Sequence, residues 1–258
     1  MTRTYVVTGA ASGIGSATTS RLRQEGHRVI GVDLHDADVT ADLSTPQGRT
    51  RMADTIADMS GGRIDAVLAI AGLNAPIPAT VLVNYFGAVA TLDSLRPLIA
   101  QSDAPRAAAV TSIASLHPHD DALLEACLSG DEAAALQRAQ QLADQGDGYQ
   151  IYSTSKQALA RWIRQNAPTP SWAGAHIPLN AIAPGVVLTP MTADLVHTEQ
   201  GRKQLTEQVP MPLNGPFKAD TAAELLTWLT SPSNSHLCGQ VIFLDGGYDA
   251  LTRTDTTW

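Results

Sequence analysis

A tyrosine and a lysine stand four positions apart in the stretch YSTSK, at Tyr152 and Lys156. On a helix these side chains share one face, because positions i and i+4 are neighbours on the helix surface. A phenol has an ordinary pKa of about 10, and a neighbouring cation favours its ionised form. The pair therefore predicts a hydroxyl tuned for proton transfer. The alternative for this pentapeptide alone is a solvent-exposed helix face, and the rest of the chain must decide.

A glycine-rich turn, TGAASGIG, follows the first apolar segment and opens the first helical one. Gly9, Gly13 and Gly15 permit a tight turn and a close approach of the backbone to a phosphate, and the start of a helix favours an anion. Asp33 ends the second apolar segment, where an acidic residue binds the ribose hydroxyls of NAD and repels a 2′-phosphate. The stretch predicts a dinucleotide site that prefers NAD, although glycine turns and strand-end carboxylates also occur without ligands.

Short apolar segments alternate with longer helical patterns along the chain. The predicted strands are apolar on both faces, as strands covered by helices on both sides are, and they lie at 4–9, 28–33, 66–72, 107–113, 178–185 and 240–247. Helices are predicted at 13–25, 46–59, 84–100, 152–166 and 220–230. This alternation predicts an α/β fold with a Rossmann-like, doubly wound parallel sheet. Residues 1–258 contain no repeat or linker and are expected to form a single domain.

A helical insertion before Tyr152 is predicted at about 116–148, because the stretch 120–146 is polar and helix-forming. Ser129 or Asp131 can cap its second helix, and Gly146 can end that helix. Its expected apolar face consists of Leu136, Ala139, Leu142 and Ala143.

A second long segment, 190–217, is predicted to be a substrate lid. Its apolar side chains form either that lid or a cover of the core, and they are Met191, Leu195, Leu205, Val209, Met211, Leu213 and Phe217.

The chain has 258 residues, 44% of them hydrophobic, and a formal net charge of −8. The negative charge argues against binding to nucleic acid or an anionic membrane surface. No apolar run approaches the roughly 20 residues of a membrane span. The first residues leave no room for the apolar region of a signal sequence, so none is expected. The two cysteines form no spacing motif and indicate a reducing compartment. These features predict a cytoplasmic protein.

Seven motifs in register resemble those of the short-chain dehydrogenase/reductases. They are TGAASGIG, Asp33, the Ala-Gly pair at 71–72, Asn84 in VNYFG, Ser112 in VTSIAS, YSTSK, and NAIAPGVVLTPM at 180–191, and the agreement continues to LDGG at 244–247. One departure is Ile70, where most members have Asn before the Ala-Gly pair. That replacement questions a stabilising contact of the central sheet, not the chemistry.

The resemblance implies roles for individual residues. Tyr152 would be the catalytic acid/base, Lys156 would lower its pKa and bind the nicotinamide ribose, Ser112 would bind the substrate oxygen, and Asn84 would hold a water in a proton relay. Asp42 and Leu43 would contact adenine. NAD would be bound by Gly9, Ser12, Gly13, Ile14, Gly15, Asp33, Asp42, Leu43, Ala71, Gly72, Tyr152, Lys156, Pro184, Gly185, Val187 and Thr189.

Within the family, the long insertion and the stretch GHRVIGVDLHDADVTADLST resemble the bacterial 3α-hydroxysteroid dehydrogenase/carbonyl reductases. This implies NAD(H)-dependent interconversion of a secondary alcohol and a ketone on a steroid-like ring. Alternatives are smaller alicyclic or monoterpene alcohols and a non-catalytic dinucleotide sensor, which retention of the Ser112, Tyr152 and Lys156 set opposes. Because the insertion can block a common subunit interface, a homodimer is expected. His117 and His119 in HPHDD are expected at the rim of the active site, and no metal is predicted.

Overall fold

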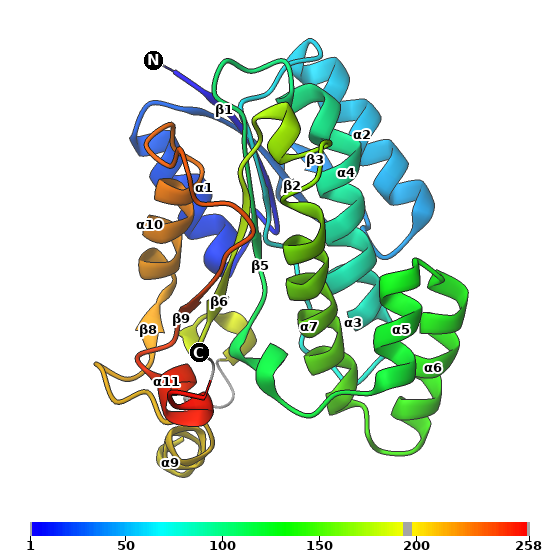
Figure 1. Cartoon of the computed structure of the whole chain (residues 1–258), viewed down its shortest axis with the longest axis vertical. Helices are drawn as coiled ribbons and strands as arrows, with labels where there is room; N and C mark the ends of the chain where they lie inside the picture. The colour runs from blue at the N-terminus through cyan, green and yellow to red at the C-terminus, as the bar shows by residue number, and fades with distance from the viewer. Residues whose placement is uncertain (1, 193–197, 257–258) are drawn as a thin grey trace.

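The central element of the fold is a parallel sheet of seven strands in the order β3-β2-β1-β4-β5-β6-β9 (Figure 1). The computed structural model describes residues 2–192 and 198–256. The strands are β1 (Thr4–Thr8), β2 (Arg28–Asp33), β3 (Val39–Thr40), β4 (Ala66–Ala69), β5 (Arg106–Val110), β6 (Leu179–Pro184) and β9 (Val241–Leu244), with β7 (Val187–Leu188) and β8 (Phe217–Lys218) in a separate pair. The predicted doubly wound α/β fold is confirmed.

Helices cover both faces of this sheet. They are α1 (Gly13–Gln24), α2 (Pro46–Ser60), α3 (Ala79–Val81), η1 (Leu82–Gly87), α4 (Ala88–Ile99), η2 (Ile113–Leu116), α5 (Asp121–Ser129), α6 (Glu132–Asp144), α7 (Tyr149–Asn166), η3 (Ala173–Ala175), η4 (Pro190–Thr192), α9 (Glu199–Gln208), α10 (Ala219–Leu229) and α11 (Tyr248–Arg253). In Figure 1, α1 and α10 lie on one side of the sheet, and α2, α4 and α7 lie on the other. The predicted helices all form, within a few residues of their expected ends.

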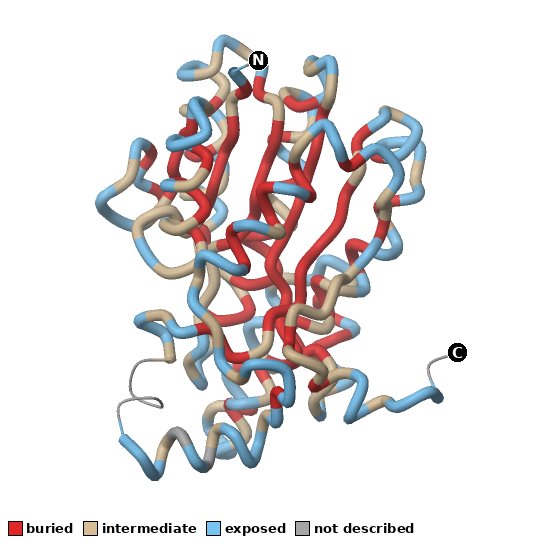
Figure 2. The backbone as a smooth tube through the Cα atoms, turned by 90° about the vertical axis from the view of Figure 1, so that its left-hand side faces the viewer, coloured by how far each residue is buried: buried red, intermediate tan, exposed pale blue. Residues whose placement is uncertain are grey.

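The central strands are buried along their whole length, as Figure 2 shows in red. Their side chains enter two apolar clusters, one facing α2, α4 and α7 and the other facing α1 and α10. This explains why the strands are apolar on both faces. The short strands β3, β7 and β8 were not predicted, because two residues carry no periodicity.

The predicted insertion consists of two helices, α5 and α6, which lie outside α7 at the lower right of Figure 1. Asp120 caps α5 by accepting a hydrogen bond from the N–H of Leu123, and Asp131 caps α6 by accepting one from Ala134. Asp131, not Ser129, is therefore the cap. Gly146 follows the helix end with a φ of +83°, as expected.

The apolar face of α6 differs from the expected one at one position. Ala139 and Leu142 are buried, and Ala143 packs against the core, but Leu136 is 43% exposed. Ala135, one residue earlier, is buried instead. The buried stripe is therefore made of smaller side chains than the pattern indicated, and α6 packs close to its neighbours.

In the part of the chain that the structure describes, no helix is long and apolar enough to cross a membrane.

Candidate active site

A cleft of about 900 Å³ opens at the carboxyl ends of the central strands. It spans the point between β1 and β4 where the order of the strands reverses, which is where ligands bind in open α/β sheets. Every predicted cofactor residue lines this cleft, as do Ser112, Tyr152 and Lys156. Asn84 lies behind the cleft wall. The structure thus brings together segments that span 180 positions of the chain, from Gly9 to Thr189.

The glycine turn forms a cradle at one edge of the cleft. Gly9 and Gly13 have positive φ angles of +72° and +52°. A Cβ on Gly15 would clash with the carbonyl oxygen of Gly9, so only glycine fits there. The side chain of Ser12 does not cap α1, which leaves the first N–H groups of the helix open to an anion. The cradle therefore fits the diphosphate of a dinucleotide.

Asp33 connects the end of β2 to this turn. Its Oδ2 accepts a hydrogen bond from the backbone N–H of Ala11 at 2.9 Å, and its Oδ1 accepts one from Leu34 at 2.7 Å. The carboxylate is therefore fixed at the rim of the cleft. Its negative charge faces the place where the adenosine ribose of a dinucleotide would lie.

The segment 42–44 forms the next part of the rim. Asp42 accepts hydrogen bonds from the N–H and hydroxyl of Ser44 at its Oδ1, at 2.9 and 2.6 Å. Leu43 is buried at 6% exposure and lines the cleft. These contacts give the segment a compact turn beside Asp33.

Ser112, Tyr152 and Lys156 meet at the floor of the cleft. Ser112 follows β5 and caps η2 through the N–H of Ala114, which donates to its Oγ at 3.1 Å. Tyr152 lies at the end of the first turn of α7, and Lys156 lies one turn later on the same face. The Nζ of Lys156 donates to the carbonyl oxygen of Val110 at 2.9 Å. The sequence prediction that tyrosine and lysine share a face is confirmed.

The titration of this group is controlled by burial. Burial raises the pKa of the Tyr152 phenol, and a hydrogen bond with Ser112 opposes that rise. Burial also lowers the pKa of Lys156 from its ordinary 10.5 to about 8. The ammonium lies 5.9 Å from the centre of the tyrosine ring and binds Val110. That Lys156 lowers the pKa of Tyr152 stays a prediction.

Asn84 is positioned by η1, a π-helical turn that the sequence did not predict. Its Oδ1 accepts from the N–H of Leu73 at 2.7 Å, and its Nδ2 donates to the carbonyl of Leu73 and to the hydroxyl of Ser155, at 2.9 and 3.1 Å. A Cβ on Gly72 would lie 3.2 Å from this Oδ1 and 3.4 Å from the Nζ of Lys156. Asn84 therefore lies near the lysine, and its role in a proton relay stays a prediction.

Ile70 stands where the resemblance implies Asn, and Thr8 secures the backbone at this point. The Oγ1 of Thr8, at the end of β1, accepts from the N–H of Ile70 at 3.0 Å and from that of Ala71 at 3.1 Å. The end of β4 is thus fixed to β1 despite the replacement.

Met211 packs against Gly185 and Val186, which line the cleft. A Cβ on Gly185 would lie 2.9 Å from the Sδ of Met211. The N–H of Val186 donates to the same sulfur at 3.3 Å. The hydroxyl of Thr192 binds the backbone of both Val187 and Thr189. These contacts hold the strand end and the following turn against the cleft.

Only part of the predicted lid lines the cleft. Met191, Leu205 and Val209 do so, whereas Met211 is buried beneath it and Leu213 is 68% exposed. Phe217 packs against the core cluster that faces α1 and α10. Leu195 lies outside the described residues. Some side chains of this segment therefore line the cleft and others pack against the core, and its role as a substrate lid stays a prediction.

The loop after η2 is fastened to the YSTSK helix. The hydroxyl of Ser153 donates to the carbonyl of Pro118 at 2.7 Å, and the N–H of Asp120 donates to the hydroxyl of Thr154 at 3.0 Å. Arg138 of α6 binds both carboxylate oxygens of Asp120, at 3.0 and 2.6 Å. Arg138 holds the pKa of Asp120 below its ordinary range. The residues between Tyr152 and Lys156 thus anchor the loop.

His117 also lines the cleft, as expected for this loop. Its Nε2 lies 3.0 Å from the hydroxyl of Tyr248 in α11. Burial lowers the pKa of His117. Tyr248 was not predicted, because nothing in the sequence relates positions 131 residues apart. The Nε2 of His119 lies 3.2 Å from the Oδ1 of Asp121. Within residues 2–192 and 198–256, no group of three or more His, Cys, Asp or Glu side chains is placed to hold a metal ion.

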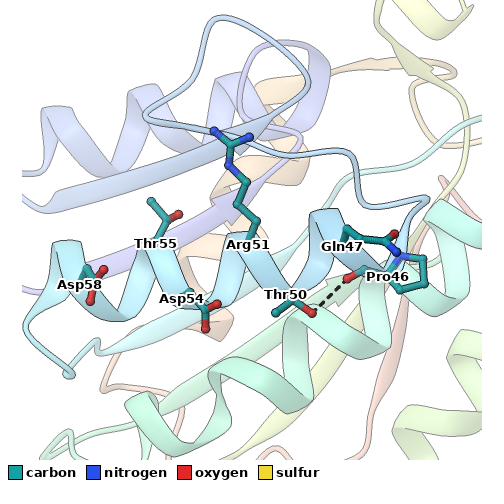
Figure 3. A pocket seen from close by; sticks show the side chains of 7 residues that line it. All are labelled: Pro46, Gln47, Thr50, Arg51, Asp54, Thr55 and Asp58. Carbon is teal, nitrogen blue, oxygen red and sulfur yellow. Dashed lines mark hydrogen bonds between the residues drawn. The ribbon is translucent and has the colours of Figure 1, made fainter.

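A second hollow lies on the outer face of α2, which begins two residues after Ser44 of the cleft rim (Figure 3). All its lining residues belong to this one helix, and the hydroxyl of Thr50 binds the carbonyl of Pro46 within it. A shallow hollow on a single helix offers no converging groups, so it is not a candidate site.

Comparison with known proteins agrees with this geometry. A family model described as enoyl-(acyl carrier protein) reductase matches residues 9–249. The 3-alpha-hydroxysteroid dehydrogenase/carbonyl reductase of Comamonas testosteroni is 35% identical over 254 residues, which cover 96% of this chain and 97% of that protein. The coniferyl-alcohol dehydrogenase of Pseudomonas sp. strain HR199 is 29% identical, with 94% of each chain covered.

A solved structure is similar along almost the whole chain. The crystal structure of the 3-alpha-hydroxysteroid dehydrogenase from Pseudomonas sp. B-0831, complexed with NADH, has a TM-score of 0.89 and 37% sequence identity, and the match covers 98% of this chain and 99% of that one. The match of the family over residues 9–249 and the cleft geometry lead to one conclusion. The chain belongs to the short-chain dehydrogenase/reductase family of oxidoreductases.

Proposed function

We propose that this protein is an NAD(H)-dependent oxidoreductase that interconverts a secondary alcohol and a ketone on a hydrophobic ring compound of the 3α-hydroxysteroid type. The observation that carries the proposal is the meeting of Ser112, Tyr152 and Lys156 beside the glycine cradle in one cleft. A proton-transfer group and a dinucleotide site within one cavity are what alcohol oxidation requires.

The residues supply proton transfer and orientation. When bound, the nicotinamide accepts or delivers the hydride. Ser112 donates a hydrogen bond to the substrate oxygen, and Tyr152 takes the hydroxyl proton during oxidation or returns it during reduction. Lys156 adds a positive charge near the phenol, and its bond to Val110 holds this charge in place. Since burial raises the pKa of Tyr152, formation of the phenolate requires nearby positive charge. Lys156 and the bound, oxidised nicotinamide would supply it.

NAD is favoured over NADP by the rim of the cleft. The fixed carboxylate of Asp33 would bind ribose hydroxyls and repel a 2′-phosphate. Leu34, the next residue, is 57% exposed and apolar, and Ser12 on the other side is uncharged. Neither position offers the cation that a 2′-phosphate needs. The relative from Pseudomonas sp. B-0831, whose structure contains NADH, supports the same choice.

A hydrophobic substrate is supported by the wall opposite α7. Met191, Leu205 and Val209 line it. With a volume of about 900 Å³, the cleft has room for both a dinucleotide and a second molecule. The name of the Comamonas relative supports a steroid, and the apolar wall fits a flat alicyclic ring.

The test is an assay of NAD⁺ reduction with androsterone, cyclohexanol and carveol, followed by NADH absorbance. Tyr152→Phe should lose activity by about 10²–10⁴-fold, which is the usual contribution of a positioned acid/base. Tyr85→Phe is the matched control, since Tyr85 is a buried phenol outside the cleft.

Turnover of androsterone that Tyr152→Phe loses and Tyr85→Phe keeps supports the proposal. Turnover of only cyclohexanol or carveol would keep the mechanism and replace the substrate class with smaller rings. No turnover of any alcohol or ketone, with NAD⁺ still bound, would overturn the enzyme and favour a dinucleotide sensor.

We further propose a homodimer. Helices α5 and α6 pack on α7, and α6 also contacts η1, so they cover the side of these helices that lies away from the sheet. That face is then unavailable to a second subunit, so fewer surfaces remain through which subunits can associate. Light scattering should give twice the chain mass of 27.2 kDa. A stable tetramer or a monomer at micromolar concentration would contradict the proposal.

The proposed location is the cytoplasm. Cys127 and Cys238 are both free, which suits a reducing compartment. Fractionation of cells that express the native gene tests this, and recovery from the periplasm or the membrane would contradict it.

A further inference from the structure

The segment 42–44, at the predicted adenine end of the cleft, is packed tightly between two helices. A Cβ on Gly48, in the first turn of α2, would clash with the carbonyl oxygen of Asp42. A Cβ on Gly87, at the end of η1, would lie 3.1 Å from both the Cβ and the carbonyl oxygen of Leu43. The position of Leu43 is therefore set by how α2 and η1 approach each other.

Arg49, the residue after Gly48, holds this segment directly. Its Nε donates to the carbonyl oxygen of Leu43 at 2.8 Å, and its Nη2 donates to that of Ser44 at 3.2 Å. Its guanidinium carbon lies 6.0 Å from the centre of the Phe86 ring. The Arg49 side chain is only 10% exposed, so these contacts are largely shielded from water.

The insertion supplies the charge that holds Arg49. Glu132, at the start of α6, accepts from Nη1 at 2.6 Å and from Nη2 at 2.9 Å. This two-pronged geometry fixes the plane of the guanidinium. The glutamate is 30% exposed, so salt screens the pair less than it screens a surface pair. The insertion therefore contacts the backbone beside the adenine end through one arginine.

We propose that Arg49 and Glu132 are positioning residues for the cofactor, through which the helical insertion fixes the adenine end of the cleft. Arg49 would hold Leu43 and Ser44 where an adenine ring packs, and Glu132 would hold Arg49. The inference rests on the proposed NAD(H) function and on the placement of adenine beside 42–44.

A second ion pair of the same insertion provides a contrast. Arg138, two turns further along α6, binds Asp120, which is tied to Thr154 of the catalytic helix. Arg138 binds the loop between η2 and α5, whereas Arg49 binds the segment 42–44 at the predicted adenine end. If the insertion only stabilises the fold, loss of either ion pair should weaken binding equally at both ends of the cleft. If it positions the cofactor, loss of the Arg49–Glu132 pair should weaken binding at the adenine end, and loss of the Arg138–Asp120 pair should not.

The experiment measures binding by calorimetry in Glu132→Ala, Arg49→Met, the double variant and the wild type. The probes are ADP-ribose, which contains adenosine, and nicotinamide mononucleotide, which lacks it. ADP-ribose affinity should fall about tenfold in each variant, as expected for loss of hydrogen bonds to charged groups. Nicotinamide mononucleotide affinity should stay within about twofold, because its half of the cleft is not touched.

Since the two residues act as a unit, the double variant should bind ADP-ribose no more weakly than Arg49→Met. With NAD⁺ saturating, kcat should match the wild type while KM for NAD⁺ rises. Arg138→Gln should leave the ADP-ribose affinity unchanged, and so should Gln140→Ala, an exposed change on the same helix.

Circular dichroism excludes misfolding as the cause, and Glu132→Gln, which keeps one acceptor, gives a milder variant if Arg49→Met does not fold. Asp33→Asn distinguishes failure of the positioning role from failure of the proposed placement of adenine. If Asp33→Asn weakens ADP-ribose but Glu132→Ala, Glu132→Gln and Arg49→Met do not, the positioning role is wrong. If none of these variants changes ADP-ribose binding, the placement of adenine itself is wrong.

Discussion

The Nζ of Lys156 lies 2.9 Å from the carbonyl oxygen of Val110, two residues before Ser112. Helix α7, which carries Tyr152 and Lys156, is thereby connected to the end of β5 through a charged hydrogen bond. The lysine is 4% exposed, and burial lowers its pKa to about 8. A buried cation with one protein acceptor is costly to the fold, so its presence is explained by function rather than by stability.

Lys156→Met should therefore lose activity and gain stability. The folded pKa of about 8 lies below the ordinary 10.5, so the unfolded state holds its proton to higher pH. Below pH 8 this difference costs about 3 kcal/mol of the free energy of unfolding. Methionine removes that cost but leaves the Val110 carbonyl without its donor, so the net gain should be roughly 1–2 kcal/mol at pH 7.

The measurement is urea unfolding of both proteins between pH 7 and 10.5. The gain should shrink as the pH rises through the window from about 8 to 10.5, because the wild type recovers the cost when its lysine loses its proton. Lys203→Met, an exposed change, serves as the control and should show neither effect. A Lys156→Met protein less stable than the wild type at pH 7 would refute this account.

Gly15→Ala should abolish dinucleotide binding, since the added methyl group would clash with the Gly9 carbonyl. Displacing that backbone costs about 1–3 kcal/mol of the free energy of unfolding and distorts the cradle. Gly174→Ala is the matched control, because its Cβ would lie 3.5 Å from Pro170 in ordinary contact. Thermal unfolding with and without NAD⁺ checks both variants. A Gly15→Ala protein still stabilised by NAD⁺ would show that the cradle does not hold the cofactor.

Asp33→Asn should shift the cofactor preference toward NADP⁺. The change removes the charge that repels a 2′-phosphate while keeping the shape of the side chain. The ratio of kcat/KM for NADP⁺ to that for NAD⁺ should rise about ten- to hundredfold. Steady-state kinetics with both cofactors measure it. Asp36→Asn is the control, because Asp36 is exposed and contacts the exposed His35, and it should keep the ratio of the wild type. An unchanged ratio in Asp33→Asn would argue against the ribose role.

Tyr248→Phe should affect the substrate rather than the cofactor. The variant frees His117, which lines the cleft, from its contact with the tyrosine hydroxyl. Loss of one hydrogen bond predicts a rise in KM for a large ring substrate of about two- to tenfold. KM for NAD⁺ should not change. His35→Ala, at an exposed position, is the control, and equal effects on both KM values would point to a general loss of structure.

Burial lowers the pKa of His117, which keeps the imidazole neutral at pH 7. The unfolded state binds its proton at higher pH than the folded state does, so stability should fall as the pH falls below 6.5. The wild type should show this loss more steeply than His117→Phe in urea unfolding between pH 5 and 7. Equal slopes in the two proteins would contradict a buried neutral histidine.

The sequence predicted those parts of the protein that depend on local backbone constraints. Gly9, Gly13 and Gly15 have the positive φ angles or close contacts that only glycine tolerates. Tyr152 and Lys156 share a helix face because their spacing is that of one turn. The strands were found because burial on both faces leaves a continuous apolar run.

Other features depend on side chains that meet across long sequence separations, which no local pattern records. Arg49 and Glu132 are 83 positions apart, and His117 and Tyr248 are 131 apart. The exposure of Leu136 was not predicted for a related reason. It depends on tertiary packing, in which the preceding residue, Ala135, faces the adjacent helices. The burial that raises the pKa of Tyr152 is likewise invisible in the pentapeptide.

The hydroxyl of Thr8 binds two successive N–H groups, those of Ile70 and Ala71. Because it bridges the backbone and not the side chain of residue 70, this join does not require a particular side chain there, although Ile70 packs in the same core cluster as Tyr5 and Val7 of β1. Ile70 also lines the cleft. Position 70 is therefore a place where directed evolution can reshape the pocket with libraries of apolar residues, while Thr8 keeps the two strand ends joined.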